Sequence, residues 1–205
     1  RDRYLHDSFQ SDPFFWGIKT IFTIHNLKFQ GTWSVDTIKG FSGLSDYYFT
    51  SDKLEAYGNG NMLKGGLVYA DRITTVSRSY ASEIRMPFYG EGLDGLLRAR
   101  SKQLSGIVNG IDYNVYNPKT DKDIAVNYSV EDVIKAKAAN KTALQKELGL
   151  EENPDAFMLG IVSRLTDQKG LDLVECVLDQ ICAEDVQLVV LGTGEGKYQD
   201  MFTYY

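Results

Sequence analysis

The chain has 205 residues, of which 43% are hydrophobic and 24% charged, as is ordinary for a soluble globular protein. A formal net charge of −6 and an isoelectric point near 5.0 argue against a nucleic-acid backbone or an anionic membrane as the main partner, although a local basic spot could still bind a small anion. This length suits one large domain or two small ones.

The sequence contains no secretory leader and no apolar run of about 18 residues, so we expect a soluble, cytoplasmic protein that is not exported. Cys176 and Cys182 lie on one predicted helix without the spacing of a metal site, and a reduced pair is the expected state. The sequence has two histidines, His6 and His25, which excludes a histidine-rich metal site.

Short β-branched runs alternate with amphipathic helical stretches along the chain. A helix-like pattern covers residues 1–9, and the predicted strands are 18–24, 72–77, 104–110, 157–165 and 186–192. The predicted helices are 61–70, 79–85, 92–100, 130–149 (with Gly149 as a C-cap), 170–183 and 197–203. This alternation predicts an α/β fold with mainly parallel sheets, and such apolar strands suit a sheet that is covered on both faces. Ligands of these sheets bind at the carboxyl ends of the strands.

A polar stretch without periodicity, residues 111–129, separates strand 104–110 from helix 130–149. A loop of this length is uncommon inside one compact domain, so we interpret it as the crossing between two domains, residues 1–109 and 110–205. Each part holds only two or three predicted strands, so neither is expected to be a finished doubly wound sheet.

Arg164 and Lys169 flank the end of strand 157–165 and the start of helix 170–183, where Thr166 or Asp167 could act as the helix cap. A lysine in the first turn of a helix is unfavourable because the macrodipole is positive there. An anion such as phosphate, held by the helix N-terminus and these two cations, would reverse that sign. The alternative is that both side chains point into water.

The next strand ends in "LGTGEGKY", residues 191–198, which fits neither common phosphate-binding motif. Gly192, Gly194 and Gly196 miss the dinucleotide-binding spacing by one residue, and the lysine that follows them lacks the serine or threonine of a P-loop. Two interpretations remain: a turn where the backbone approaches a ligand closely, or a tight turn with a structural role alone.

Several stretches together resemble bacterial glycogen synthase and plastidial starch synthase. They are "FTIHNLKFQG" (22–31), "NMLKGGLVYADRITTVS" (61–77), "YGEGLDGLLRAR" (89–100), "GIVNGIDYNVYNP" (106–118), "GIVSRLTDQKGLDL" (160–173) and "LGTGEGKYQDMF" (191–202). The resemblance implies the GT-B fold of two Rossmann-like domains, with parts of both present here. Residues 1–109 would be the later part of the N-terminal, acceptor-side domain, and residues 110–205 the crossing and the first part of the donor domain.

The same resemblance implies an enzyme that transfers glucose from ADP-glucose to the non-reducing end of an α-1,4-glucan, with retention, without a cofactor or metal. Arg164 and Lys169 would hold the distal phosphate of the donor, and His25 would meet the transferred glucose. Asn109 and Gly110 would lie near the cleft, where Asn109 either contacts the sugar or caps a turn. Gly192 and Gly194 would lie at the donor site. The parent would be cytoplasmic, or stromal in a plant plastid.

Two glycine-rich stretches are interpreted more conservatively. "KGGL" at 64–67 is similar to the N-terminal donor loop of the family but stands at another place in the family order, so Lys64 is expected to be a helix or surface lysine. "YGEGLDGLLR" is expected to be a mobile lead into helix 92–100. The family's N-terminal donor loop and its C-terminal donor-site segment are not in the sequence, so we expect an internal fragment that is inactive by itself.

Two alternatives remain open on the sequence: another GT-B transferase with a different nucleotide sugar or acceptor, and a non-catalytic fragment that binds nucleotide or glucan. The failed glycine spacing disfavours an NAD-dependent oxidoreductase. The residues do not decide between ADP and UDP, and they do not predict the oligomeric state.

Overall fold

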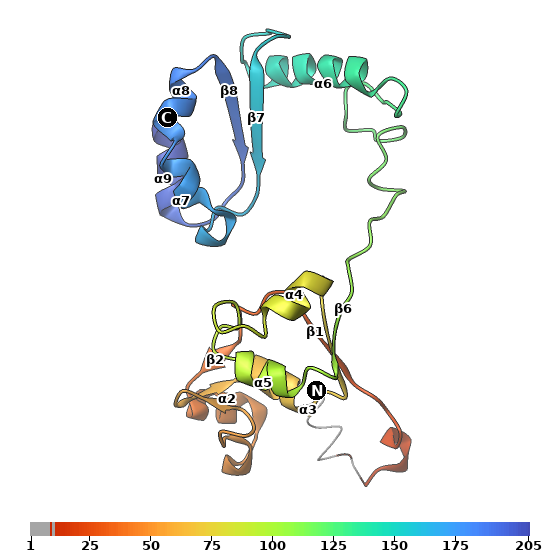
Figure 1. The fold of residues 1–205 in the computed structure, drawn as a ribbon, viewed down its shortest axis with the longest axis vertical. Coiled ribbons are helices and arrows are strands. Elements are labelled where there is room, and N and C mark those ends of the chain that lie inside the picture. Colours follow the sequence, from red (N-terminus) through yellow and green to blue (C-terminus); the bar gives the residue numbers. More distant parts are fainter. Residues whose placement is uncertain (1–8, 10) are drawn as a thin grey trace. The chain divides into compact units, whose positions relative to one another are not determined.

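A computed structural model of the chain describes residues 9 and 11–205, which form two compact units, Arg1–Ile111 and Asp112–Tyr205 (Figure 1). The boundary between the units falls within the polar stretch that begins at residue 111. Residues 107–132 contain no helix or strand. Of the helix-like pattern over residues 1–9, all but Phe9 lies outside the described residues, as does His6.

The first unit is built around a parallel sheet with the strand order β1-β5-β6. The three strands are β1 (Ile21–Ile24), β5 (Arg72–Thr75) and β6 (Leu104–Gly106), in register from Ile21 opposite Arg72 to Thr75 opposite Gly106. The helices α3 (Met62–Tyr69), α4 (Arg78–Glu83) and α5 (Asp94–Ala99) accompany this sheet (Figure 1). These strands and helices confirm the predictions, with strand ends up to four residues shorter.

A single apolar cluster holds the parallel sheet of the first unit against its helices. Its buried members are Ile24, Leu27, Leu67, Ile73, Ile84, Leu93 and Leu97. Burial of large aliphatic side chains contributes about 1.5–3 kcal/mol each, so this cluster stabilises the packing of the helices on the sheet. It lies directly beneath the loop that follows β1, because both Ile24 and Leu27 belong to it.

The first unit also contains a small antiparallel sheet and one helix that were not predicted from the sequence. The sheet has the order β2-β4-β3, with β2 (Thr32–Trp33), β3 (Glu55–Ala56) and β4 (Asn59–Asn61), and strands this short carry no measurable period. Helix α2 (Val35–Ser42) was recognisable in principle. The Ser34 side chain caps its N-terminus, and Gly43 ends it in the left-handed conformation at φ 67°. The 3-10 turns Pro13–Phe15 and Asp46–Tyr48 complete the unit.

The second unit has one parallel strand pair, β7 (Phe157–Val162) and β8 (Val186–Leu191), in register from Phe157 opposite Val186 to Val162 opposite Leu191. Its helices are α6 (Val133–Glu147), α7 (Leu171–Glu175), α8 (Leu178–Ala183) and α9 (Gly196–Tyr204), with a 3-10 turn at Asp167–Lys169 (Figure 1). Helix α6 ends as predicted, with Gly149 in the left-handed conformation just after its last turn.

Two predictions for this unit were wrong. The predicted helix 170–183 is two short helices, because the chain leaves helical geometry at Val177 (φ −119°, ψ 1°) between α7 and α8. The strands are also not covered on both faces: no residue of β7 or β8 is fully buried, and Val162 is 80% exposed. Ile161 and Val190 do pack against the buried cluster of Leu165, Leu171 and Tyr198.

None of the helices in the described part of the chain is both long enough and apolar enough to cross a membrane. Cys176 and Cys182 are exposed, and each is a free thiol.

Candidate functional site

The loops that follow β7 and β8 run side by side beyond the ends of the strands. The backbone of Leu165 donates a hydrogen bond to the carbonyl of Thr193 (2.9 Å), and its own carbonyl accepts one from the N–H of Glu195 (2.8 Å). Leu165 and Gly194 form a parallel bridge. The carboxyl edge of this strand pair is therefore a ladder of two loops, and it is where ligands of parallel sheets bind.

Gly192 and Gly194 are required by the close approach of these loops. A Cβ atom would lie 1.9 Å from the carbonyl oxygen of Ser163 at Gly192, and 2.2 Å from that of Leu165 at Gly194. Both distances are impossible for real atoms, so only glycine fits at either position. Of the two interpretations left open by the sequence, the structural one therefore explains both glycines, since the approaching backbone belongs to the neighbouring loop.

Arg164 and Lys169 belong to the first of the two loops, and both side chains are exposed. Lys169 is the last residue of the 3-10 turn, and Gly170 follows it in the left-handed conformation (φ 69°) before α7 begins. Lys169 thus lies immediately before the helix, in agreement with its predicted place in or near the first turn. Helix α7 is too short for its dipole to matter much. Neither Arg164 nor Lys169 forms an ion pair with any residue that the structure describes.

Asp167 lies between these two cations in the sequence, and residues of α9 donate hydrogen bonds to its carboxylate. Its Oδ1 atom accepts hydrogen bonds from Lys197 Nζ (2.6 Å) and from Tyr198 Oη (2.6 Å). The Asp167 carboxylate raises the pKa of Lys197 and that of Tyr198, in both cases chiefly through the hydrogen bond. This contact was not predicted, because the sequence around Lys197 signals only a failed P-loop match and the contact with Asp167 depends on how the two loops pair.

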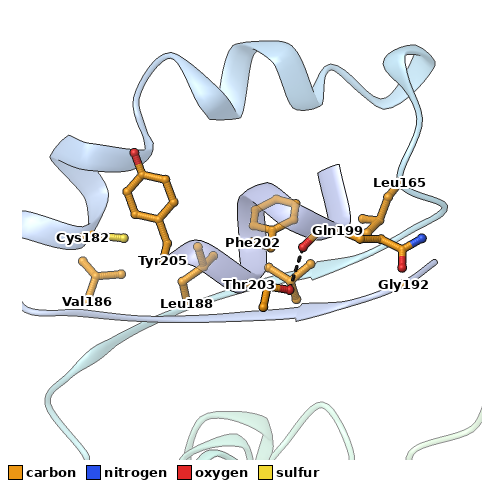
Figure 2. A pocket seen from close by; sticks show the side chains of 10 residues that line it. Leu165, Cys182, Val186, Leu188, Gly192, Gln199, Phe202, Thr203 and Tyr205 are labelled. Atoms are coloured by element: carbon orange, nitrogen blue, oxygen red, sulfur yellow. Dashed lines mark hydrogen bonds between the residues drawn. The ribbon is translucent and has the colours of Figure 1, made fainter. Parts of the chain in front are cut away.

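A cavity of about 580 Å³ borders the ladder on the α9 side of β8 (Figure 2). It is lined by β8 residues such as Leu188 and α9 residues such as Phe202, and Figure 2 shows these two side chains on the same side of the strand. Its lining, among the described residues, includes Leu165 and Gly192 but neither Arg164 nor Lys169. The cavity is therefore distinct from the two cations.

His25 lies at the carboxyl edge of the other sheet, directly after β1, and is exposed. Its neighbours fix the loop. Ile24 and Leu27 are buried, the Leu27 N–H donates to Tyr80 Oη (3.1 Å), and Asn26 Oδ1 accepts from the backbone N–H of Lys28 (3.0 Å). Asn26 thus shapes the loop, while His25 is displayed from an anchored backbone.

Asn109 and Gly110 follow β6 at the same edge of the sheet, and both are exposed. The Asn109 side chain makes no hydrogen bond to any described residue, so turn capping is not what the structure contains. Gly106, at the end of β6, has a clear structural role: a Cβ there would lie 2.1 Å from the carbonyl oxygen of Ser77. The stretch that leads to Asn109 is therefore fixed against the loop after β5.

Lys64 is a structural lysine, as predicted. It lies in α3, and its Nζ atom donates to the backbone carbonyls of Ser51 and Glu55. The glycines beside it are needed for packing, because a Cβ at Gly66 would lie 2.3 Å from the Phe22 ring.

The lead into α5 is tied to the rest of its unit at two points. Gln30 Nε2 donates to the carbonyl of Glu91 (2.9 Å), and Tyr57 Oη donates to that of Gly92 (3.2 Å). These contacts hold the segment that we had expected to be mobile.

The fold and the site together define a class: an α/β protein with two units, each built on parallel strands, and a basic loop at the carboxyl edge of one strand pair. Residues 2–99 match the family described as the starch synthase catalytic domain. The glycogen synthase of Lachnospira eligens is 65% identical over 202 residues, which are 98% of this chain and 42% of that protein. That of Lachnoclostridium phytofermentans is 60% identical over the same shares of both chains.

Among solved structures, the catalytic domain of starch synthase IV from Arabidopsis thaliana, bound to ADP and acarbose, matches with a TM-score of 0.86. It is 30% identical, and the match covers 98% of this chain and 41% of that one. The chain is thus similar to glycogen and starch synthases over almost its whole length, as its motifs had indicated, and it spans about two fifths of the length of these relatives.

Proposed function

We propose that the chain is part of a glycogen synthase, a hexosyltransferase that moves glucose from ADP-glucose to the non-reducing end of an α-1,4-glucan with retention. The observation that carries the proposal is the 65% identity to a glycogen synthase over 98% of this chain. The activity would belong to a full-length synthase, meaning a protein of the relatives' length that contains this sequence. Its location would be the cytoplasm.

The basic loop after β7 supplies the chemistry that this reaction needs most. Breaking the bond between glucose and ADP leaves negative charge on a phosphate oxygen, and fixed cations accelerate the reaction where that charge develops. Arg164 and Lys169 are exposed and belong to a loop whose backbone is bonded to its neighbour. In this proposal both bind the distal phosphate, Arg164 with a planar fork of donors and Lys169 as a point charge.

The remaining roles rest on the motif match. His25 would contact the transferred glucose and Asn109 would contact a sugar hydroxyl, with Gly110 beside it near the cleft. Gly192 and Gly194 would act at the donor site indirectly, by letting their loop pair with the loop of Arg164. ADP as the nucleotide is supported by the ADP in the Arabidopsis structure. No metal or cofactor takes part in the proposed reaction.

Calorimetric titration of ADP and, separately, UDP into the full-length synthase would test the proposal. The variant is Lys169→Ala. Its control is Lys102→Ala, which replaces an exposed lysine of the first unit. We expect ADP to bind in preference to UDP, and Lys169→Ala but not Lys102→Ala to weaken that binding. Equal binding of both nucleotides by all three proteins would contradict the assigned site.

A further inference from the structure

Helix α9 contacts both loops of the ladder at once. Tyr198 and Lys197, in its first turn, bond to Asp167 of the first loop, and Gln199 Nε2 donates to the carbonyl of Gly194 in the second loop (2.8 Å). The Tyr198 ring is 1% exposed and belongs to the same buried cluster as Leu165 and Leu171, which lie on either side of Asp167 in the sequence. The phenol oxygen therefore projects from a rigid support.

Asp167 stands between Arg164 and Lys169 in the loop, so its charge opposes any anion that they bind. A free carboxylate there would attract one of the two cations or repel the diphosphate. Instead its Oδ1 atom is bonded to Lys197 and Tyr198, and Lys197 is also 3.6 Å from a carboxylate oxygen of Glu195. The negative charge of Asp167 is thus compensated by Lys197 of α9, the helix that follows the second loop.

We propose that Asp167 is a positioning residue of the donor site: bound to Tyr198 and Lys197 of α9, it fixes the 164–169 loop so that Arg164 and Lys169 are presented to the diphosphate. This inference rests on the proposed function. It goes beyond that function by assigning a role to three residues to which the proposed function gives none. The raised pKa of the Tyr198 phenol supports it, since the phenol remains a donor to the carboxylate well into the alkaline range.

The sign of the effect separates positioning from simple electrostatics. If Asp167 were only a negative charge near the anion, Asp167→Ala would tighten ADP binding. Positioning predicts the opposite, because the released loop must be ordered again when ADP binds. Tyr198→Phe isolates the positioning effect, since it removes one hydroxyl, changes no charge and leaves the buried ring in place.

The test measures ADP affinity by calorimetry in the full-length synthase for Asp167→Ala, Tyr198→Phe and the double variant. Matched controls on α9 are Asp200→Ala and Tyr204→Phe, which alter exposed side chains of the same helix. We expect each single variant to weaken ADP binding about fivefold or more, as the loss of a hydrogen bond to a charged group allows. The double variant should bind ADP no more weakly than the single variant with the lower ADP affinity, because both substitutions act through one contact. The controls should bind ADP normally.

A second arm introduces Asp167→Ala into the double variant Arg164→Ala, Lys169→Ala. If Asp167 acts only through these two cations, the added substitution should not change ADP affinity further. A third arm measures amide hydrogen exchange over residues 165–170 without nucleotide, and both Asp167→Ala and Tyr198→Phe should accelerate it. Lowered thermal stability with unchanged ADP affinity and unchanged exchange would overturn the proposal, as would tighter ADP binding by Asp167→Ala.

The outcomes separate this inference from the proposed function. If Lys169→Ala binds ADP normally while loop exchange still rises in the Asp167 and Tyr198 variants, the proposed anion site fails, and the presentation of its cations fails with it. If Lys169→Ala weakens ADP binding and the Asp167 and Tyr198 variants do not, the site stands and the positioning role is wrong.

Discussion

Leu165 and Gly194 form a parallel backbone bridge three residues beyond the last residues of β7 and β8. The register of the strand pair therefore continues into the two loops that carry the candidate site. A loop extended in this way has its backbone groups bonded to the neighbouring loop. That bonding gives the exposed side chains of Arg164 and Lys169 a fixed starting point for binding an anion.

The bridge depends on glycine at position 194, so Gly194→Ala should destabilise the second unit. Its Cβ would lie 2.2 Å from the Leu165 carbonyl oxygen, which forces the two loops apart and costs about 1–3 kcal/mol. Gly196→Ala is the matched control, because no atom lies within 4 Å of the Cβ that it adds. Urea unfolding should show a lower midpoint for Gly194→Ala alone, and equal midpoints would contradict the required close approach.

Lys169→Ala should lower kcat/KM of the full-length synthase for ADP-glucose about tenfold or more, which is about 1.4 kcal/mol of transition-state stabilisation. The loss should appear in kcat as well as in KM, because charge on the leaving phosphate develops during bond breaking. Initial rates of glucose transfer to a glucan would measure it, with the exposed Lys102→Ala as control. An unchanged kcat/KM would remove Lys169 from the mechanism.

The sequence predicted the parallel strands and most helices because each carries its own signal in a continuous apolar run or a helical repeat. The break between α7 and α8 had no such signal, since the apolar repeat of Leu171, Val174, Leu178 and Ile181 continues across it. The exposure of β7 and β8 could not be predicted either, because apolar strands reveal that they pack but not which face is covered.

The candidate site was predictable to the same degree. Arg164 and Lys169 were found from local motifs, and their loop lies at the carboxyl edge of β7 where the α/β pattern predicted it. The contact of Asp167 with Tyr198 joins residues 31 positions apart in the chain. It exists only because two loops pair in one register, which a single sequence does not specify.

Lys64→Met should destabilise the first unit without changing catalysis. The lysine donates to the carbonyls of Ser51 and Glu55, of which the Glu55 contact is partly buried, and losing the charged donor to that carbonyl costs about 1–3 kcal/mol. We expect a lower unfolding midpoint and an unchanged kcat/KM, with the exposed Lys28→Met as control. A variant of normal stability with a raised KM for ADP-glucose would instead make Lys64 a donor-site residue.

The stabilisation that Asp71 gives the first unit should be lost in acid. Its carboxylate accepts hydrogen bonds from the Thr20 N–H (2.9 Å), Lys19 Nζ (3.0 Å) and Thr20 Oγ1 (3.2 Å), and the backbone bond, followed by that of Lys19, lowers its pKa well below the usual 3.8. A lowered folded-state pKa means that the stabilisation is fully present above the unfolded-state pKa and is lost as the pH falls through the folded-state value.

The stability difference between the native chain and Asp71→Asn should therefore be largest near neutral pH and should shrink as the pH is lowered below about 4. Urea unfolding of both proteins at about pH 7, 5 and 3 would measure it. Lys19→Met serves as a graded control: it removes the second cause of the shift and leaves the Thr20 bond, so it should lose only part of the pH dependence. A difference that stays constant with pH would mean that the Asp71 carboxylate is not held in its charged form by Thr20 and Lys19.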